Sequence, residues 1–319
     1  MNIAAKLGAY AVSLALVFGA AVVTGAAVGP IGETSGSGHE AVSDGAMPTA
    51  AGLEVSSGGY TLAPAATRYD PGDDVEFAFR IEGPDGMPVT RYDELHDKEL
   101  HLIVVRRDLS GFQHVHPTRD ISGTWSVPLD LSIPGTYRVL ADFKPTGSDS
   151  APNDAMPDAA MSVVLGADVF VPGLQTDAGL PEPAATASVD GYDVALRGAL
   201  VAGEESTVTL TVSKDGKPVA DLQPYLAAYG HLVALRSGDL AYLHVHPDGE
   251  PGGGRTDAGP GITFHAQVPS VGTYRLYLDF RHRNRVRTAE FTVEASATRA
   301  APATGDHGEG GRDHMEDGS

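Results

Sequence analysis

The chain of 319 residues contains no cysteine. This absence excludes disulfide bonds, thiolate metal sites, catalysis by a cysteine nucleophile and anchoring through a lipid-modified cysteine. Any transition-metal site in this protein must therefore be built from histidine, carboxylate or methionine side chains.

Basic residues are also scarce, with 22 Lys and Arg against 42 Asp and Glu, which gives a net charge of -20. Nucleic acids and anionic lipids are repelled by such a chain, and both are excluded as ligands. The charge favours cations without specifying one. Core-forming residues are plentiful, because 42% of the chain is hydrophobic, which is enough for packed domains.

Helical periodicity is missing after residue 30, while 39 Gly and 22 Pro indicate many turns. The one long apolar segment, residues 7–28, is long enough to span a bilayer, which takes about 20 residues. Lys6 precedes it, and no Lys or Arg follows until Arg68. This asymmetry places the rest of the chain outside the cytoplasm. We expect a single-pass cell-membrane protein, or a secreted one if the segment is a signal peptide cleaved near Ala27.

Two copies of one pattern follow this segment. Residues 112–117 (FQHVHP) match residues 242–247 (YLHVHP), and the sequence GTYR occurs at both 135–138 and 272–275. The predicted organisation is an N-terminal transmembrane or signal segment (1–29), a flexible stalk (30–58), a first β-sandwich repeat (59–172), a linker (173–186), a second repeat (187–296) and a disordered acidic tail (297–319).

About seven short strands are predicted in each copy, which is typical of a sandwich. In the second copy they cover roughly residues 193–200, 206–213, 231–236, 241–246, 262–268, 273–280 and 286–294. The predicted fold is all-β, with two tandem immunoglobulin-like β-sandwich domains. Trp125 and Phe264 occupy matching positions and are predicted to be core aromatics.

Both copies contain the spacing H-x12-H-x-H. Two histidines separated by one residue on a strand share a face, and the first histidine lies on the preceding strand of a hairpin that closes near Asp108. If the loop has an even number of residues, the first and third histidines lie opposite each other, and three imidazoles converge. The predicted metal ligands are His101, His114 and His116 in the first copy and His231, His244 and His246 in the second.

Further residues are weaker candidates for the same chemistry. His265 and His282 in the second copy and His96 in the first could add a ligand, and Asp142 and Asp279 could orient an imidazole. The alternative is that the histidines are structural, because their face also carries Ile103, Val105 and Phe112 and could cover the sandwich core. The spacing alone leaves both interpretations open.

The segments around these histidines, residues 96–117 and 224–247, resemble a family of actinobacterial secreted or membrane proteins labelled heavy-metal-binding or heavy-metal-associated. The resemblance covers nearly the whole chain, and it implies an extracytoplasmic location and a link to copper or other heavy metals. By position it carries over only the two H-x12-H-x-H sets. The Cys-x-x-Cys motif of heavy-metal-associated domains is missing here, so a thiolate mechanism does not apply.

Three functions are compatible with the sequence. The first is a membrane-tethered protein that buffers or transfers metal, copper first and zinc second, with a metal transporter or another envelope protein as partner. The second is an interaction module of the cell envelope with structural histidines and no metal. The third is a zinc-dependent hydrolase or hydratase. Because no duplicated Glu is placed as a general base and no nucleophile motif occurs, we expect a protein that is not an enzyme.

Overall fold

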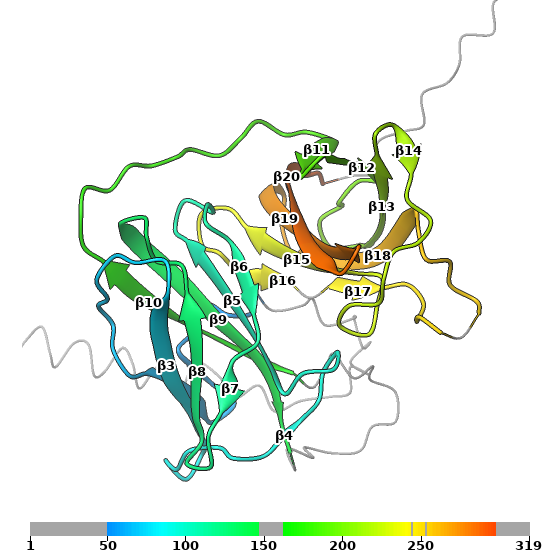
Figure 1. Ribbon diagram of the computed structural model, residues 1–319. Helices are drawn as coiled ribbons and strands as arrows, with labels where there is room; N and C mark the ends of the chain where they lie inside the picture. Colours follow the sequence, from blue (N-terminus) through cyan, green and yellow to red (C-terminus); the bar gives the residue numbers. More distant parts are fainter. Residues whose placement is uncertain (1–49, 147–161, 244, 253, 298–319) are drawn as a thin grey trace, which may run out of the picture. The chain divides into compact units, whose positions relative to one another are not determined.

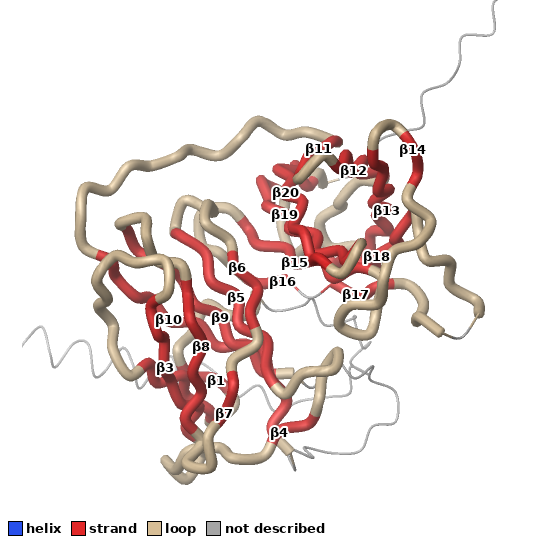
Figure 2. The backbone as a smooth tube through the Cα atoms, in the orientation of Figure 1, coloured by secondary structure: helices blue, strands red, loops and turns tan. Residues whose placement is uncertain are grey.

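The computed structural model describes residues 50–146, 162–243, 245–252 and 254–297 (Figure 1). These residues form strands, turns and loops, with no helix among them (Figure 2). The predicted all-β class is confirmed. The predicted N-terminal segment and the acidic tail from residue 298 lie outside the described residues. Within the described part of the chain, no helix is long and apolar enough to cross a membrane.

The first repeat is a sandwich of two antiparallel sheets (Figure 1). One sheet has the order β1-β2-β3-β8-β7, and the other has the order β10-β9-β5-β6, with β4 paired to β9. The strands are β1 (Ser56–Ser57), β2 (Tyr60–Pro64), β3 (Val75–Glu82), β4 (Tyr92–Asp93), β5 (Leu100–Arg106), β6 (Gln113–Val115), β7 (Thr118–Arg119), β8 (Thr124–Leu129), β9 (Gly135–Pro145) and β10 (Val163–Val171).

The second repeat has the same plan, with sheets β11-β12-β13-β18-β17 and β16-β15-β19-β20, and β14 paired to β13. This two-sheet arrangement, found twice in the chain, is that of an immunoglobulin-like sandwich, as the sequence predicts. The strands are β11 (Thr186–Val189), β12 (Tyr192–Arg197), β13 (Glu205–Lys214), β14 (Lys217–Pro218), β15 (Gly230–Arg236), β16 (Tyr242–Leu243), β17 (Val245–Pro247), β18 (Gly261–Gln267), β19 (Gly272–His282) and β20 (Arg285–Ala295).

Each sandwich has its own hydrophobic core. Trp125 is 2% exposed in the first core and Phe264 is fully buried in the second, so their predicted role as core aromatics is confirmed. Trp125 stacks on Phe79 at 6.4 Å between ring centroids and meets Tyr92 edge-on at 5.2 Å. Such aromatic contacts add to the stabilisation that comes from burial alone.

Strand β5 is buried along both faces. Leu102 and Val104 point into the core of the first sandwich, while Ile103 and Val105 belong to a third apolar cluster. This cluster also contains residues of the second repeat, among them Tyr277. The face that carries the histidines therefore packs on the second repeat and not on the core of its own sandwich.

One predicted strand of the second repeat is divided. The sequence predicts a single strand over 241–246, but β16 pairs with β15 in one sheet and β17 pairs with β18 in the other. The first repeat shows the same passage from one sheet to the other between β6 and β7. Period-two patterning indicates which residues share a face, but it does not reveal where a strand changes sheets.

The end of the predicted stalk belongs to the first sandwich. Strand β1 pairs with β2, and the carbonyls of Gly52 and Leu53 both accept hydrogen bonds from the guanidinium of Arg138, at 2.6 and 2.7 Å. Composition alone predicts a flexible segment here, because Gly and Ser are frequent. The buried guanidinium of Arg138 binds the backbone carbonyls of this segment. Amino-acid composition does not predict such a contact.

Candidate metal centre

The hairpin formed by β5 and β6 brings three histidines onto one face. Its register pairs Leu102 with Val115 and Ile103 with His114, which places His101 opposite His116. The loop parity on which the sequence argument depends is therefore the observed one. The turn closes at Leu109, whose amide donates to the carbonyl of Arg106.

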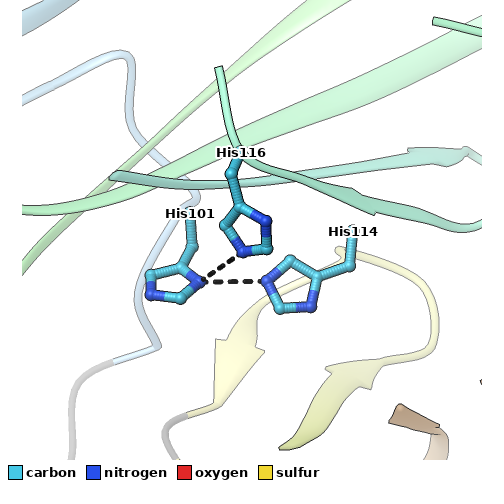
Figure 3. Close-up of side chains that lie close together, drawn as sticks. All are labelled: His101, His114 and His116. Carbon is cyan, nitrogen blue, oxygen red and sulfur yellow. Dashed lines mark hydrogen bonds between the residues drawn. The ribbon is translucent and has the colours of Figure 1, made fainter. Parts of the chain in front are cut away.

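The three imidazoles converge on one point (Figure 3). His101 Nδ1 lies 3.1 Å from His114 Nε2 and 3.2 Å from His116 Nε2. One nitrogen from each ring falls within 4.8 Å of the others. In a tetrahedral site with Zn–N bonds of about 2.0–2.1 Å, neighbouring ligand nitrogens lie about 3.3–3.4 Å apart. The observed separations are close to that value. We call His101, His114 and His116 the triad.

The outer nitrogens of two triad rings are held by acceptors. His101 Nε2 lies 2.8 Å from the carbonyl of Leu95, and His114 Nδ1 lies 2.7 Å from Asp279 Oδ2. A carbonyl oxygen and a carboxylate oxygen accept hydrogen bonds, so each of these nitrogens is the N–H donor. In the neutral tautomers, the inner nitrogens of both rings then carry lone pairs that face each other. Two lone pairs at 3.1 Å require a cation between them, either a proton or a metal ion.

Burial opposes protonation of two triad rings. Desolvation, followed by the nearby His114, lowers the pKa of His101 to about 2 and that of His116 to about 3. Burial and the same neighbours lower the pKa of His231 well below its ordinary value. These imidazoles are therefore neutral at physiological pH, and the neutral ring is the form that ligates metal.

One histidine of the second set, His231, lies against the triad. The ring of His231 stands 5.5 Å from that of His101 and 5.0 Å from that of His114. Burial lowers the pKa of His96, and the nearby His246, in β17, lowers it further. His244 lies outside the described residues. The expectation of a separate cluster in the second half therefore stays a prediction, while His231 lies beside the first repeat's histidines.

His96, a weaker sequence candidate, also lies in this region. Its ring is 6.1 Å from that of His101 and 5.4 Å from that of His231. His96 lies in the loop between β4 and β5, and its backbone has a φ of 49°. A loop position of this kind has no fixed strand face, so the sequence could not place it relative to the triad.

Two other weaker candidates serve different roles. His265, in β18, has Nδ1 3.7 Å from Glu205 Oε1. His282 is buried between the hydroxyl of Tyr192, 2.8 Å from Nδ1, and Asp221 Oδ1, 3.1 Å from Nε2. The structure does not group either residue with the triad.

Replacing His282 with phenylalanine is expected to lower the free energy of unfolding by about 1–3 kcal/mol, because the buried hydroxyl of Tyr192 loses its partner. Metal affinity should stay unchanged. Urea denaturation and metal titration of the same preparation check both statements, with the part-exposed His265→Ala as the matched control. A tenfold loss of metal affinity in His282→Phe would contradict the placement of this residue.

The two aspartates identified in the sequence act across the repeats. Asp279, in β19 of the second repeat, holds His114 of the first, and its other oxygen accepts from Thr288 at 2.6 Å. Asp142, at the matching position of the first repeat, accepts from the hydroxyl of Tyr242 at 3.2 Å. Sequence reasoning identified the residue type. It missed that each aspartate serves the opposite repeat.

The duplicated pattern and its fold match one family, described as a domain of unknown function (DUF8832), over residues 54–152 and 187–297. The chain belongs to this family. Its first DUF8832 segment covers β1 to β9 of the first sandwich, its second covers nearly all of the second sandwich, and each contains one H-x12-H-x-H set. No curated protein matches the chain.

Solved structures similar to this DUF8832 protein share little sequence with it. A DUF4426 family protein from Pseudomonas aeruginosa is 10% identical, with a TM-score of 0.26, over 36% of this chain and 98% of that one. The adhesin InvE of Yersinia pseudotuberculosis is 12% identical and the Escherichia coli adhesin FdeC 16%, both with a TM-score of 0.22. The match to InvE spans 74% of this chain and 58% of InvE, and the match to FdeC spans 75% of this chain and 64% of FdeC. At such scores these similarities carry no inference about function.

Proposed function

We propose that this DUF8832 protein binds a transition-metal ion through His101, His114 and His116. The observation that carries the proposal is the convergence of one nitrogen from each of three imidazoles within 4.8 Å, with two of the rings fixed from behind by a carbonyl and a carboxylate. Imidazoles in metal sites are held in this way, since the outer hydrogen bond sets the tautomer and aims the lone pair at the ion.

The donor set limits the metal. Three neutral imidazoles without thiolate suit copper or zinc, whereas calcium and magnesium prefer oxygen ligands. Copper is the first choice in an extracytoplasmic, thiol-free protein, and zinc is the second. We propose buffering or transfer of metal at the outer membrane face, with an envelope protein or transporter as the partner.

A second candidate function follows from the contact between His114 and Asp279. Both side chains are nearly inaccessible, with 1% and 3% of their surface exposed, and they join the two repeats. With a proton between His114 and His101 in place of a metal, the same histidines would be purely structural. The protein would then be a β-sandwich interaction module of the cell envelope, as the sequence also allows.

Metal titration of the intact chain separates these functions. We expect saturable binding of copper(II) and zinc(II) with a Kd in the micromolar range or tighter, which corresponds to about 8 kcal/mol or more of binding free energy. Competition with a chromophoric chelator measures it. His265→Ala, which removes an imidazole away from the triad, is the control and should bind as the wild type does. Failure to bind either ion would leave the interaction module as the function.

A further inference from the structure

His231 is a histidine of the second repeat whose ring packs on two rings of the triad. It is near the start of β15 and only 8% exposed. Its ring centroid is 5.0 Å from that of His114, a separation that falls among those within the triad itself, which run from 4.9 to 5.3 Å. The same ring lies parallel to that of His101, with 6° between their planes.

The Nδ1 atom of His231 is buried without a hydrogen-bond partner in the described part of the chain. An unpaired polar atom in a protein interior is destabilising, so such atoms are rare and call for an explanation. For an imidazole packed on two rings of the triad, a cation shared with the triad is the direct explanation.

The triad and the second repeat meet at this point through several contacts. Asp279 of the second repeat holds His114, and Tyr242 donates to Asp142 of the first. Beneath the histidines, Tyr277 donates to the carbonyl of Leu109 at 2.7 Å and stacks on Phe112 at 3.9 Å. The second repeat thus already holds one triad ring and presents an unpaired imidazole beside it.

We infer that His231 supplies a fourth nitrogen to the ion, so that the metal is shared between the two repeats. The inference rests on the proposed function. Four imidazoles complete a tetrahedral shell that three would leave open. Because the ion then contacts both repeats, metal binding and repeat docking strengthen each other, and loss of the ion loosens the contact between β5 and β15.

The test counts imidazole ligands in the zinc-loaded intact chain by X-ray absorption spectroscopy. The wild type is expected to show four, and His231→Phe, which keeps a ring in the packed position, is expected to show three. Zinc affinity should fall at least about 10-fold in His231→Phe, since even residues that only orient a ligand contribute 10- to 100-fold. Asp279→Asn, which removes an orienting carboxylate, should lose affinity without losing a ligand. His265→Ala should match the wild type in both measurements.

The outcomes distinguish this inference from the function on which it rests. If the wild type binds no zinc, the metal function itself fails. If the wild type binds zinc with three imidazoles, or if His231→Phe retains the wild-type ligand number and affinity, the ion belongs to the first repeat alone and the inference is overturned. A wild-type count of three overturns the inference without any variant, so a poorly folded His231→Phe would still leave it open to refutation.

Discussion

Replacing His101 with alanine is expected to weaken zinc and copper binding by at least about 100-fold. His101 is the centre of the triad, because its Nδ1 is the atom that both His114 and His116 approach, at 3.1 and 3.2 Å. Removal of a group that merely orients a metal ligand costs about 10- to 100-fold, and removal of the shared ligand should exceed that range. Chelator competition on the intact chain measures the loss.

Folding must be separated from binding in this variant. His101→Ala also removes the hydrogen bond to the carbonyl of Leu95, which contributes about 0.5–1.5 kcal/mol of stability in the metal-free protein. The metal-free melting temperature of His101→Ala should therefore fall only slightly, while the stabilisation that zinc gives to the wild type disappears. Retention of wild-type affinity by a folded His101→Ala would show that the convergence of rings is structural.

The geometry of the triad could be predicted because the direction of side chains along a strand depends only on the local backbone. Side chains alternate along a strand, and a hairpin of known parity fixes which residues face each other, so the spacing H-x12-H-x-H is enough to place three rings together. The observed register of His114 opposite Ile103 is the one this argument requires. Duplication of the motif reinforced the prediction without adding geometry.

The contact between repeats could not be predicted from alternation, because a pattern does not state which surface covers a second apolar face. The sequence did carry a signal. Residues 102–105 and 232–235 are continuous apolar runs, and such runs are typical of strands buried on both sides. In the structure Ile103 and Val233 are both fully buried in the third cluster. The site therefore depends on the packing of the first repeat against the second, which the sequence pattern does not specify.

Placement of Asp279 shows the same limit. From the sequence it is an aspartate in the second repeat, two residues after Tyr277, and a role within its own repeat is the natural expectation. In the structure its carboxylate meets His114 of the first repeat. Asp142, its counterpart, meets Tyr242. Among the described residues the two matching aspartates therefore have different partners, and Tyr242 stands where the first repeat has Phe112.

Tyr277→Ala is expected to lower the free energy of unfolding by about 3–5 kcal/mol, the range found when a large buried aromatic is truncated. Tyr277 is fully buried, and its ring stacks on Phe112. Burial raises the pKa of its phenol, which therefore stays protonated and donates to the carbonyl of Leu109. Tyr277→Phe keeps the ring and should cost only about 1 kcal/mol, which makes it the matched control.

The same substitution should also affect metal binding. Because Tyr277 and Asp279 are two apart on β19 and share a face, losing the packing of Tyr277 should also free Asp279 from His114. We therefore expect zinc affinity to fall in Tyr277→Ala and to persist in Tyr277→Phe, measured beside urea denaturation. Loss of stability with unchanged zinc affinity would mean that the triad holds its ion without the docked second repeat.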